Sequence, residues 1–178
     1  MLRSVPFTFK SYPIIRGGAT IKTFIGAIEG IAGYAPIKLT NYDLIVVNVG
    51  TNDVGNGRSV TQIEGDMIRL FETIRIMNKH ATITIASILN RPCDDNTSRD
   101  TVNNANAAFV KLCTNKPNSF YLRTASIFRL DKNCLKIELF TVEGLHLNSF
   151  GKKRIGGYLS SMLGNGNIRT MLRRYPGK

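Results

Sequence analysis

A seven-residue run from Asp43 to Val49 constrains the fold of this chain more than any other part of its sequence. The run reads Asp-Leu-Ile-Val-Val-Asn-Val, so it is nearly all apolar and rich in β-branched residues. A strand of this composition is typical of a parallel sheet that helices cover on both faces. We therefore expect a buried strand here, inside a sheet with helices on both sides.

Segments with helical and strand-like patterns alternate along the rest of the chain. Apolar residues within 63–77 recur at steps of four and three, which indicates an amphipathic helix. Ser59 with Gln62, or Thr61 with Glu64, could form its capping box. Further helices are expected at 21–33, about 102–112 and 149–163, and further strands at 7–16, 81–89 and 119–124. This order predicts a three-layer α/β/α fold with a parallel sheet.

In a parallel sheet of this kind, ligands bind beyond the carboxyl ends of the strands. The strand ends at Val49 and Thr124 should therefore lie at the same edge. The places to search for a site are Gly17-Gly18, the residues after Val49, and the loops after Leu89 and Thr124.

Gly50-Thr51-Asn52-Asp53 follows the apolar run directly. Glycine lets the backbone turn sharply, and the short polar residues can satisfy the exposed end of the strand. The Asn52 amide would project above the sheet as a donor to an anionic group. The alternative is an ordinary Asx turn without a chemical role.

The second polar cluster is Glu143-Gly-Leu-His146-Leu-Asn148, just before the last expected helix. A carboxylate three residues before a histidine can curl back and hold the imidazole in one tautomer. The other histidine, His80, falls where the helix of 63–77 ends, and a favourable charge at that terminus explains it. His146 is the candidate for chemistry.

Together these clusters resemble the SGNH/GDSL hydrolase superfamily, over roughly Phe7 to Leu163. That family carries a GDS serine motif, a glycine after the second strand, a GxND motif and a DxxH motif, in this order. Here GTND at 50–53 matches GxND, Gly18 stands in the place of the glycine, and Glu143 to His146 matches DxxH with Glu in place of Asp. The resemblance implies a flavodoxin-like sheet.

The resemblance also implies serine-esterase chemistry. A serine would attack the ester carbonyl, His146 would take its proton, and Glu143 would orient His146. The Gly18 N–H and the Asn52 side chain would help to form the oxyanion hole. Gly50, Thr51 and Asp53 would shape the motif rather than react. No metal or cofactor is expected, and the substrate would be a small-molecule or polymer-borne ester.

Two departures from the family pattern stand out. Glu143 is one methylene longer than the aspartate of the family motif. Asp131 or Glu138 is poorly placed in the sequence to orient His146 instead. No Gly-Asp-Ser triplet precedes Gly18. We expect the serine at or just before Met1, so that the chain starts too late to include it or the first strand, which lies inside the sheet in this family. Ser4 and Ser11 are weaker candidates for the nucleophile, because neither follows a strand and a glycine turn.

The charge of the chain opens an alternative. Lysine and arginine outnumber aspartate and glutamate by 24 to 12, a formal net charge of +12, which favours nucleic acid or other polyanions as partners. The basic residues gather toward the C-terminal end, at Lys152, Lys153, Arg154, Arg169, Arg173, Arg174 and Lys178. They could equally form a solvated tail. We expect an SGNH-like domain over 1–165 and a basic tail over 166–178.

The cysteine spacing and the hydropathy of the chain give evidence about the cellular compartment of the protein. Cys93, Cys113 and Cys134 are widely spaced without a CxxC pair, which argues against a disulfide framework or a zinc site. No run approaches the ~20 apolar residues of a membrane helix. The start also lacks the pattern of a signal peptide. A cytoplasmic location is favoured, and the alternative is a signal that precedes Met1 and is missing from this sequence.

Three functional hypotheses follow. The chain is a fragment of an esterase acting on acyl or acetyl esters, or a non-catalytic SGNH-like module that binds a polyanion, or an unproductive translation product. Esterase-like domains of similar EGLHLN character occur in proteins of some retroelements, which supports the second hypothesis.

Overall fold

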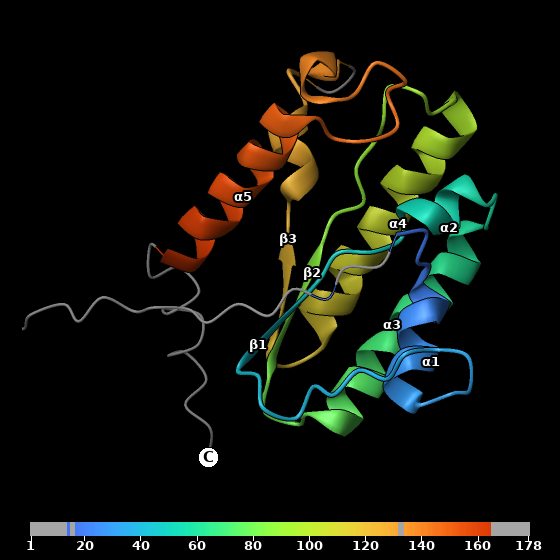
Figure 1. Cartoon of the computed structure of the whole chain (residues 1–178), viewed down its shortest axis with the longest axis vertical. Helices are drawn as coiled ribbons and strands as arrows, with labels where there is room; N and C mark the ends of the chain where they lie inside the picture. Colours follow the sequence, from blue (N-terminus) through green and yellow to red (C-terminus); the bar gives the residue numbers. More distant parts are fainter. Residues whose placement is uncertain (1–13, 15–16, 132–133, 165–178) are drawn as a thin grey trace, which may run out of the picture.

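The computed structural model describes residues 14, 17–131 and 134–164 (Figure 1). Their sheet has three strands in the order β1-β2-β3: β1 (Leu44–Val47), β2 (Thr82–Ala86) and β3 (Ser119–Leu122). Both pairings are parallel, with Ile45 opposite Ile83 and Thr84 opposite Phe120. The carboxyl ends of the strands therefore share one edge, as the sequence predicted. The strand expected at 7–16 and the tail at 166–178 lie outside the described residues, apart from Ile14.

Helices flank this short flavodoxin-like sheet on both sides. They are α1 (Ile21–Glu29), α2 (Thr51–Gly55), α3 (Val60–Met77), α4 (Asn96–Asn115) and α5 (Ser149–Gly164), with two 3₁₀ turns, η1 (Thr124–Phe128) and η2 (Ile137–Leu139). Figure 1 shows α5 on one side of the strands and α1, α3 and α4 on the other. The predicted three-layer α/β/α class is confirmed.

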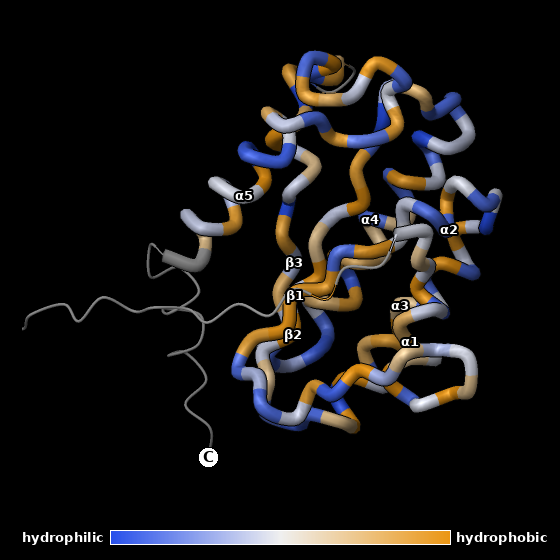
Figure 2. Tube along the Cα trace, viewed as in Figure 1, coloured by the Kyte–Doolittle hydropathy of each residue, from blue (hydrophilic) through white to orange (hydrophobic). Residues whose placement is uncertain are grey.

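The main core lies between the sheet and α3. Every residue of β2 is buried, and so is the stripe of α3 that the sequence predicted, at Ile63, Met67, Leu70 and Ile74. Figure 2 shows the apolar residues concentrated along the strands and the helix faces turned toward them. Burial of this apolar surface is the main favourable contribution to folding.

β1 differs from the expectation of a strand covered on both faces. Ile45 and Val47 pack against the core, but Val46 on the opposite face is 39% exposed. Among the described residues β1 pairs with β2 alone, so it is an edge strand. Local composition reports the hydrophobicity of a strand but not the number of its neighbours, which is why the expectation was wrong.

Helix ends follow the local capping chemistry. α1 ends at Gly30, not at the expected Gly33, because Gly30 already adopts the left-handed conformation (φ 71°) and donates its N–H to the Gly26 carbonyl. At the start of α3, Ser59 and Gln62 form the capping box, which decides between the two pairs that the sequence allowed. α4 begins earlier than expected because the Asp95 side chain accepts the Ser98 N–H.

Candidate active site

Gly50 makes the turn between β1 and α2. Its backbone is left-handed, with φ 119°, and a Cβ at this position would lie 2.6 Å from Ile88 Cδ1. A larger residue would therefore be strained in its backbone and would also clash with a buried side chain. Glycine at this position lets the polypeptide pass close to Ile88 and start α2 at Thr51, immediately beyond the strand.

The next two residues tie this turn to the loop before α1. Asn52 donates from Nδ2 to the Ala19 carbonyl at 2.8 Å, and Asp53 Oδ2 accepts the Ile21 N–H at 3.1 Å. Gly18, which adopts φ 70°, directly precedes Ala19. The structure thus brings the Gly18 loop and the Asn52 side chain together, although more than thirty residues of sequence separate them.

Asp53 is fully buried, with an exposed fraction of 0%. Burial raises the pKa of its carboxyl group, while the hydrogen bond from Ile21 and the positive charge of Arg58 oppose that rise. Its second oxygen, Oδ1, has no hydrogen-bond partner among the residues that the structure describes, and Arg58 itself forms an ion pair with Asp66 at 2.6 Å. Asp53 therefore fills a structural position without access to solvent.

The His146 loop lies between η2 and α5, and Asn148 holds it together. The Asn148 side chain donates to the carbonyls of Glu138 and Phe140 and accepts the N–H groups of Phe150 and Gly151. It therefore joins the loop to the first turn of α5. The sequence motif contained Asn148, but its role was not predicted, although an Asn just before a helix is a typical capping signal.

Gly144 anchors the His146 loop on the segment that follows β2. With φ 68°, it approaches that segment so closely that a Cβ would lie 2.8 Å from Pro92 Cβ. The neighbouring residue Arg91 points toward α2, since a Cβ on Gly55 would lie 3.8 Å from Arg91 Nη2. The segment around Pro92 thus lies between α2 and the His146 loop, at the carboxyl edge of the sheet.

Glu143 and His146 are both exposed. Hydrogen bonds from its own N–H and from Thr141 lower the pKa of the Glu143 carboxyl, and the charge of His146 acts in the same direction. Within the described residues, no hydrogen bond joins the His146 ring to Glu143 or to Asn52. The proposed catalytic roles of these residues therefore stay predictions.

The comparison with known families decides the identity of the domain. Residues 14–154 match the GDSL-like Lipase/Acylhydrolase family. The chain belongs to this family. The match includes Gly18, the GTND turn and the His146 loop, so the candidate site residues described above lie within the family region.

Solved structures agree with this GDSL-like fold. The OSK domain of Drosophila Oskar is 17% identical with a TM-score of 0.68, and covers 82% of this chain and 71% of its own. A carbohydrate esterase family 3 from Talaromyces cellulolyticus is 20% identical with a TM-score of 0.61, covering 88% and 70%. A GDSL-like lipase from Bacteroides thetaiotaomicron is 15% identical with a TM-score of 0.55, covering 84% and 73%. No curated protein matches the sequence.

The remaining sequence candidates of this GDSL-like domain take other places. Asp131 accepts the Cys134 N–H, Glu138 is exposed in η2, and His80 lies just beyond α3 with its N–H bonded to Asn78. Ser4 and Ser11 lie outside the described residues. Over the described ranges, no cluster of metal-binding side chains occurs and no helix is long and apolar enough to cross a membrane.

Proposed function

We propose that this GDSL-like domain is the histidine and oxyanion-hole part of a serine ester hydrolase that acts on acyl or acetyl esters. The observation that carries the proposal is the Asn52–Ala19 hydrogen bond at the carboxyl end of β1. It holds a side-chain amide beside the Gly18 loop, at the edge where parallel sheets present their chemistry.

Asn52 retains a donor for the reaction. Its amide nitrogen carries two hydrogens, and one is directed to the Ala19 carbonyl. The second hydrogen and the Gly18 N–H would stabilise the negative charge that develops on the carbonyl oxygen of an ester. A fixed donor of this kind contributes about 3–4 kcal/mol to transition-state stabilisation.

In this proposal His146 acts as the general base. The Glu143 carboxylate stabilises the positive charge that forms on the imidazole when it takes the proton. Glu143 lies close enough to His146 for the two charges to interact. Thr141 holds the loop that carries both residues, because its hydroxyl donates to the His146 carbonyl and accepts the His146 N–H. Substrate binding would have to bring the imidazole toward the ester, because catalytic hydrogen bonds often tighten only in the complex.

The nucleophile is the part that this sequence lacks, since it contains no Gly-Asp-Ser triplet. Without a positioned serine the covalent step is lost, and the remaining groups retain about 10³–10⁴-fold acceleration over water at best. We therefore propose that the chain as given does not turn over esters at an enzymatic rate.

Hydrolysis of p-nitrophenyl acetate tests this proposal. The chain as given is compared with a version extended at its N-terminus by a strand that ends in Gly-Asp-Ser. We expect activity only in the extended protein, a loss of about 10³-fold or more in His146→Ala, and no change in the matched control His80→Ala. Clear activity of the chain as given that disappears in Ser4→Ala would instead identify Ser4 as the nucleophile.

The charge of the domain favours a second candidate, a non-catalytic module that binds a polyanion. The formal net charge is +12, and Lys152 and Lys153 are exposed on α5. Binding to a single-stranded oligonucleotide should then weaken steeply with salt. Lys152→Gln combined with Lys153→Gln should reduce the salt slope, whereas Lys22→Gln, exposed on α1, should leave it less affected.

A further inference from the structure

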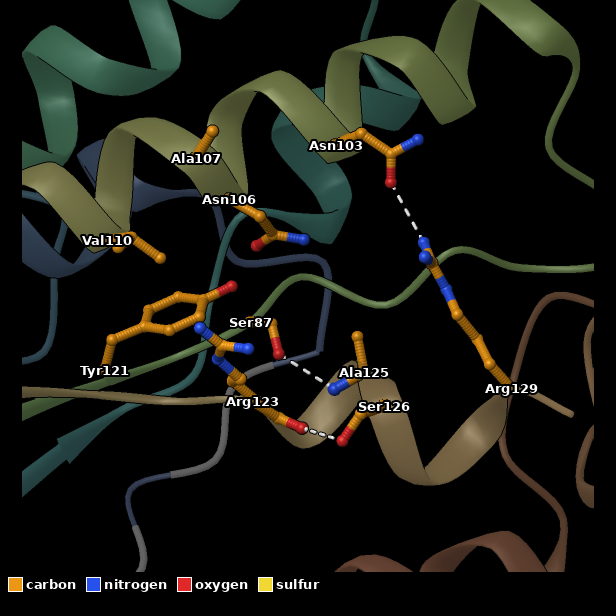
Figure 3. Close-up of a pocket in the computed structure, with 10 residues that line it drawn as sticks. All are labelled: Ser87, Asn103, Asn106, Ala107, Val110, Tyr121, Arg123, Ala125, Ser126 and Arg129. Atoms are coloured by element: carbon orange, nitrogen blue, oxygen red, sulfur yellow. Dashed lines mark hydrogen bonds between the residues drawn. The ribbon is translucent and has the colours of Figure 1, made fainter. Parts of the chain in front are cut away.

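A cavity of about 270 Å³ opens at the carboxyl ends of β2 and β3, between α4 and η1 (Figure 3). Ser87 lines it from the end of β2, and Arg123 and Arg129 line it from the segment after β3. None of the residues around it belongs to the GTND turn or to the His146 loop, and none is an aspartate or a glutamate. The cavity is therefore a separate, positively charged feature of the fold.

Within the part of the chain that the structure describes, no carboxylate pairs with either guanidinium group. The ion pairs among the described residues involve Arg58, Arg69, Arg91 and Lys116, but neither Arg123 nor Arg129. Arg129 Nη2 donates to the neutral amide oxygen of Asn103 at 2.9 Å. A guanidinium offers five N–H donors, so most of the donors of both arginines remain for a ligand.

The two arginines flank the cavity on different sides. Burial raises the pKa of Tyr121, and the charges of Arg123 and Arg129 both oppose this rise. Figure 3 shows the Arg123 guanidinium beside the Tyr121 ring, and Arg129 extended toward Asn103 across the opening. Arg123 thus places its charge on the Tyr121 side of the cavity, and Arg129 places its charge on the Asn103 side.

The rest of the lining is largely apolar. The Tyr121 ring, Val110 and Ala107 on α4, and Ala125 on η1 offer carbon surfaces. The volume lies just below the ~300–1,000 Å³ of pockets that hold drug-sized ligands. It suits a ligand with one ring or a short aliphatic body and a single charged group.

We propose that this cavity binds a small organic anion. Its apolar body lies against Tyr121 and Val110, and its carboxylate or phosphate accepts hydrogen bonds from Arg123. Arg129 adds a second positive charge on the Asn103 side of the cavity. Guanidinium groups suit both oxyanions, because their planar N–H fork matches two oxygens at once. This inference does not depend on the proposed esterase function.

Calorimetric titration with three aromatic probes tests the chemistry of the ligand. Benzoate and phenyl phosphate carry the oxyanion, and benzyl alcohol has a ring of the same size without a charge. We expect both anions to bind about tenfold or more tightly than benzyl alcohol, the difference typical of a charge-assisted hydrogen bond. Equal binding of benzyl alcohol overturns the proposal.

Variants locate the binding. Arg123→Gln and Arg129→Gln should each weaken anion binding about tenfold. Lys111→Gln is the matched control, because Lys111 is exposed on α4 and does not line the cavity. If Lys111→Gln weakens binding as much as the arginine variants, the anions respond to the overall positive charge and the proposal is wrong.

Filling the cavity provides a test that leaves the charges in place. Ala107 is exposed on α4, so Ala107→Leu should fold normally, as an unchanged thermal unfolding midpoint will show. The leucine should nevertheless reduce binding of benzoate and phenyl phosphate. If an oligonucleotide binds in an Arg123- and Arg129-dependent manner while both small anions fail to bind, the ligand is a polymer and the proposal is overturned.

Discussion

The Asp53 carboxylate accepts the backbone N–H of Ile21 at 3.1 Å, across 32 residues of sequence. The bond runs beside the one from Asn52 to Ala19, so two consecutive side chains of the GTND turn hold the loop before α1. The first two turns of the site are therefore one structural unit, and the positions of Gly18 and Asn52 depend on a buried carboxylate.

Asp53→Ala should destabilise the fold, because the Ile21 N–H loses its partner in a buried setting. The expected loss is about 1–3 kcal/mol in the free energy of unfolding, measured with urea. Asp100→Asn, at an exposed position on α4, is the control and should change stability little. A stability of Asp53→Ala equal to that of the unmodified protein would show that the bond does not support the fold.

The Asp53 carboxyl group should also make the free energy of unfolding depend on pH. Burial raises the pKa of Asp53 above its ordinary value of 3.8, so the folded state holds this proton more tightly than the unfolded chain. Its contribution is therefore fully present at low pH and is lost as the pH rises through the folded pKa. Relative to Asp53→Asn, the unmodified protein should lose stability as the pH rises above 3.8. Parallel curves for the two proteins would contradict this.

Gly50→Ala should be more harmful than an alanine at another left-handed glycine. Gly57 also has a positive φ (70°), but nothing lies within 4 Å of a Cβ there, so Gly57→Ala adds only backbone strain of about 1 kcal/mol. Gly50→Ala adds the clash with Ile88 Cδ1. The added Cβ would also lie 2.9 Å from Ile88 Cγ1, so Ile88→Ala, which removes both atoms, is the matching second variant. The double variant should lose less stability than the sum of the two single losses, as a double-mutant cycle of unfolding free energies will measure.

Ser59→Ala should lower the stability of α3 by about 1 kcal/mol, because the Gln62 N–H loses its capping oxygen. Thr61→Ala tests the other capping box that the sequence allowed and should have a smaller effect. Thermal unfolding of the two variants distinguishes them. A larger loss in Thr61→Ala would mean that the helix begins later than the structure indicates.

The cysteines should separate by reactivity toward a thiol reagent. Cys93 and Cys134 are exposed, whereas Cys113 is buried and burial raises the pKa of its thiol to about 11. Because the thiolate is the reactive form, the native protein should release two equivalents of thionitrobenzoate rapidly. The third should appear only after denaturation. Rapid release of all three from the native protein would show that Cys113, near the end of α4, is accessible to solvent.

The sequence predicted those features that depend on local chemistry. The stripe of α3, the parallel strand order and the turn after β1 all follow from apolar spacing and from glycine placement. The end of α1 did not, because Gly30 and Gly33 are both suitable stops and only the packing of the helix decides between them. The cavity of Arg123 and Arg129 was not predicted either. An arginine in a loop has the same local sequence pattern whether or not an acidic side chain lies near it in the folded protein.

The position of β1 at the edge of the described sheet has a consequence for how this site could be completed. A strand added in parallel along its outer side would run in the same direction and end next to Gly50. Whatever residue followed that strand would arrive beside Asn52 and the Gly18 loop. The geometry imposes no requirement that such a strand be joined covalently to this chain, so a separate polypeptide could supply the serine of the proposed function by fragment complementation.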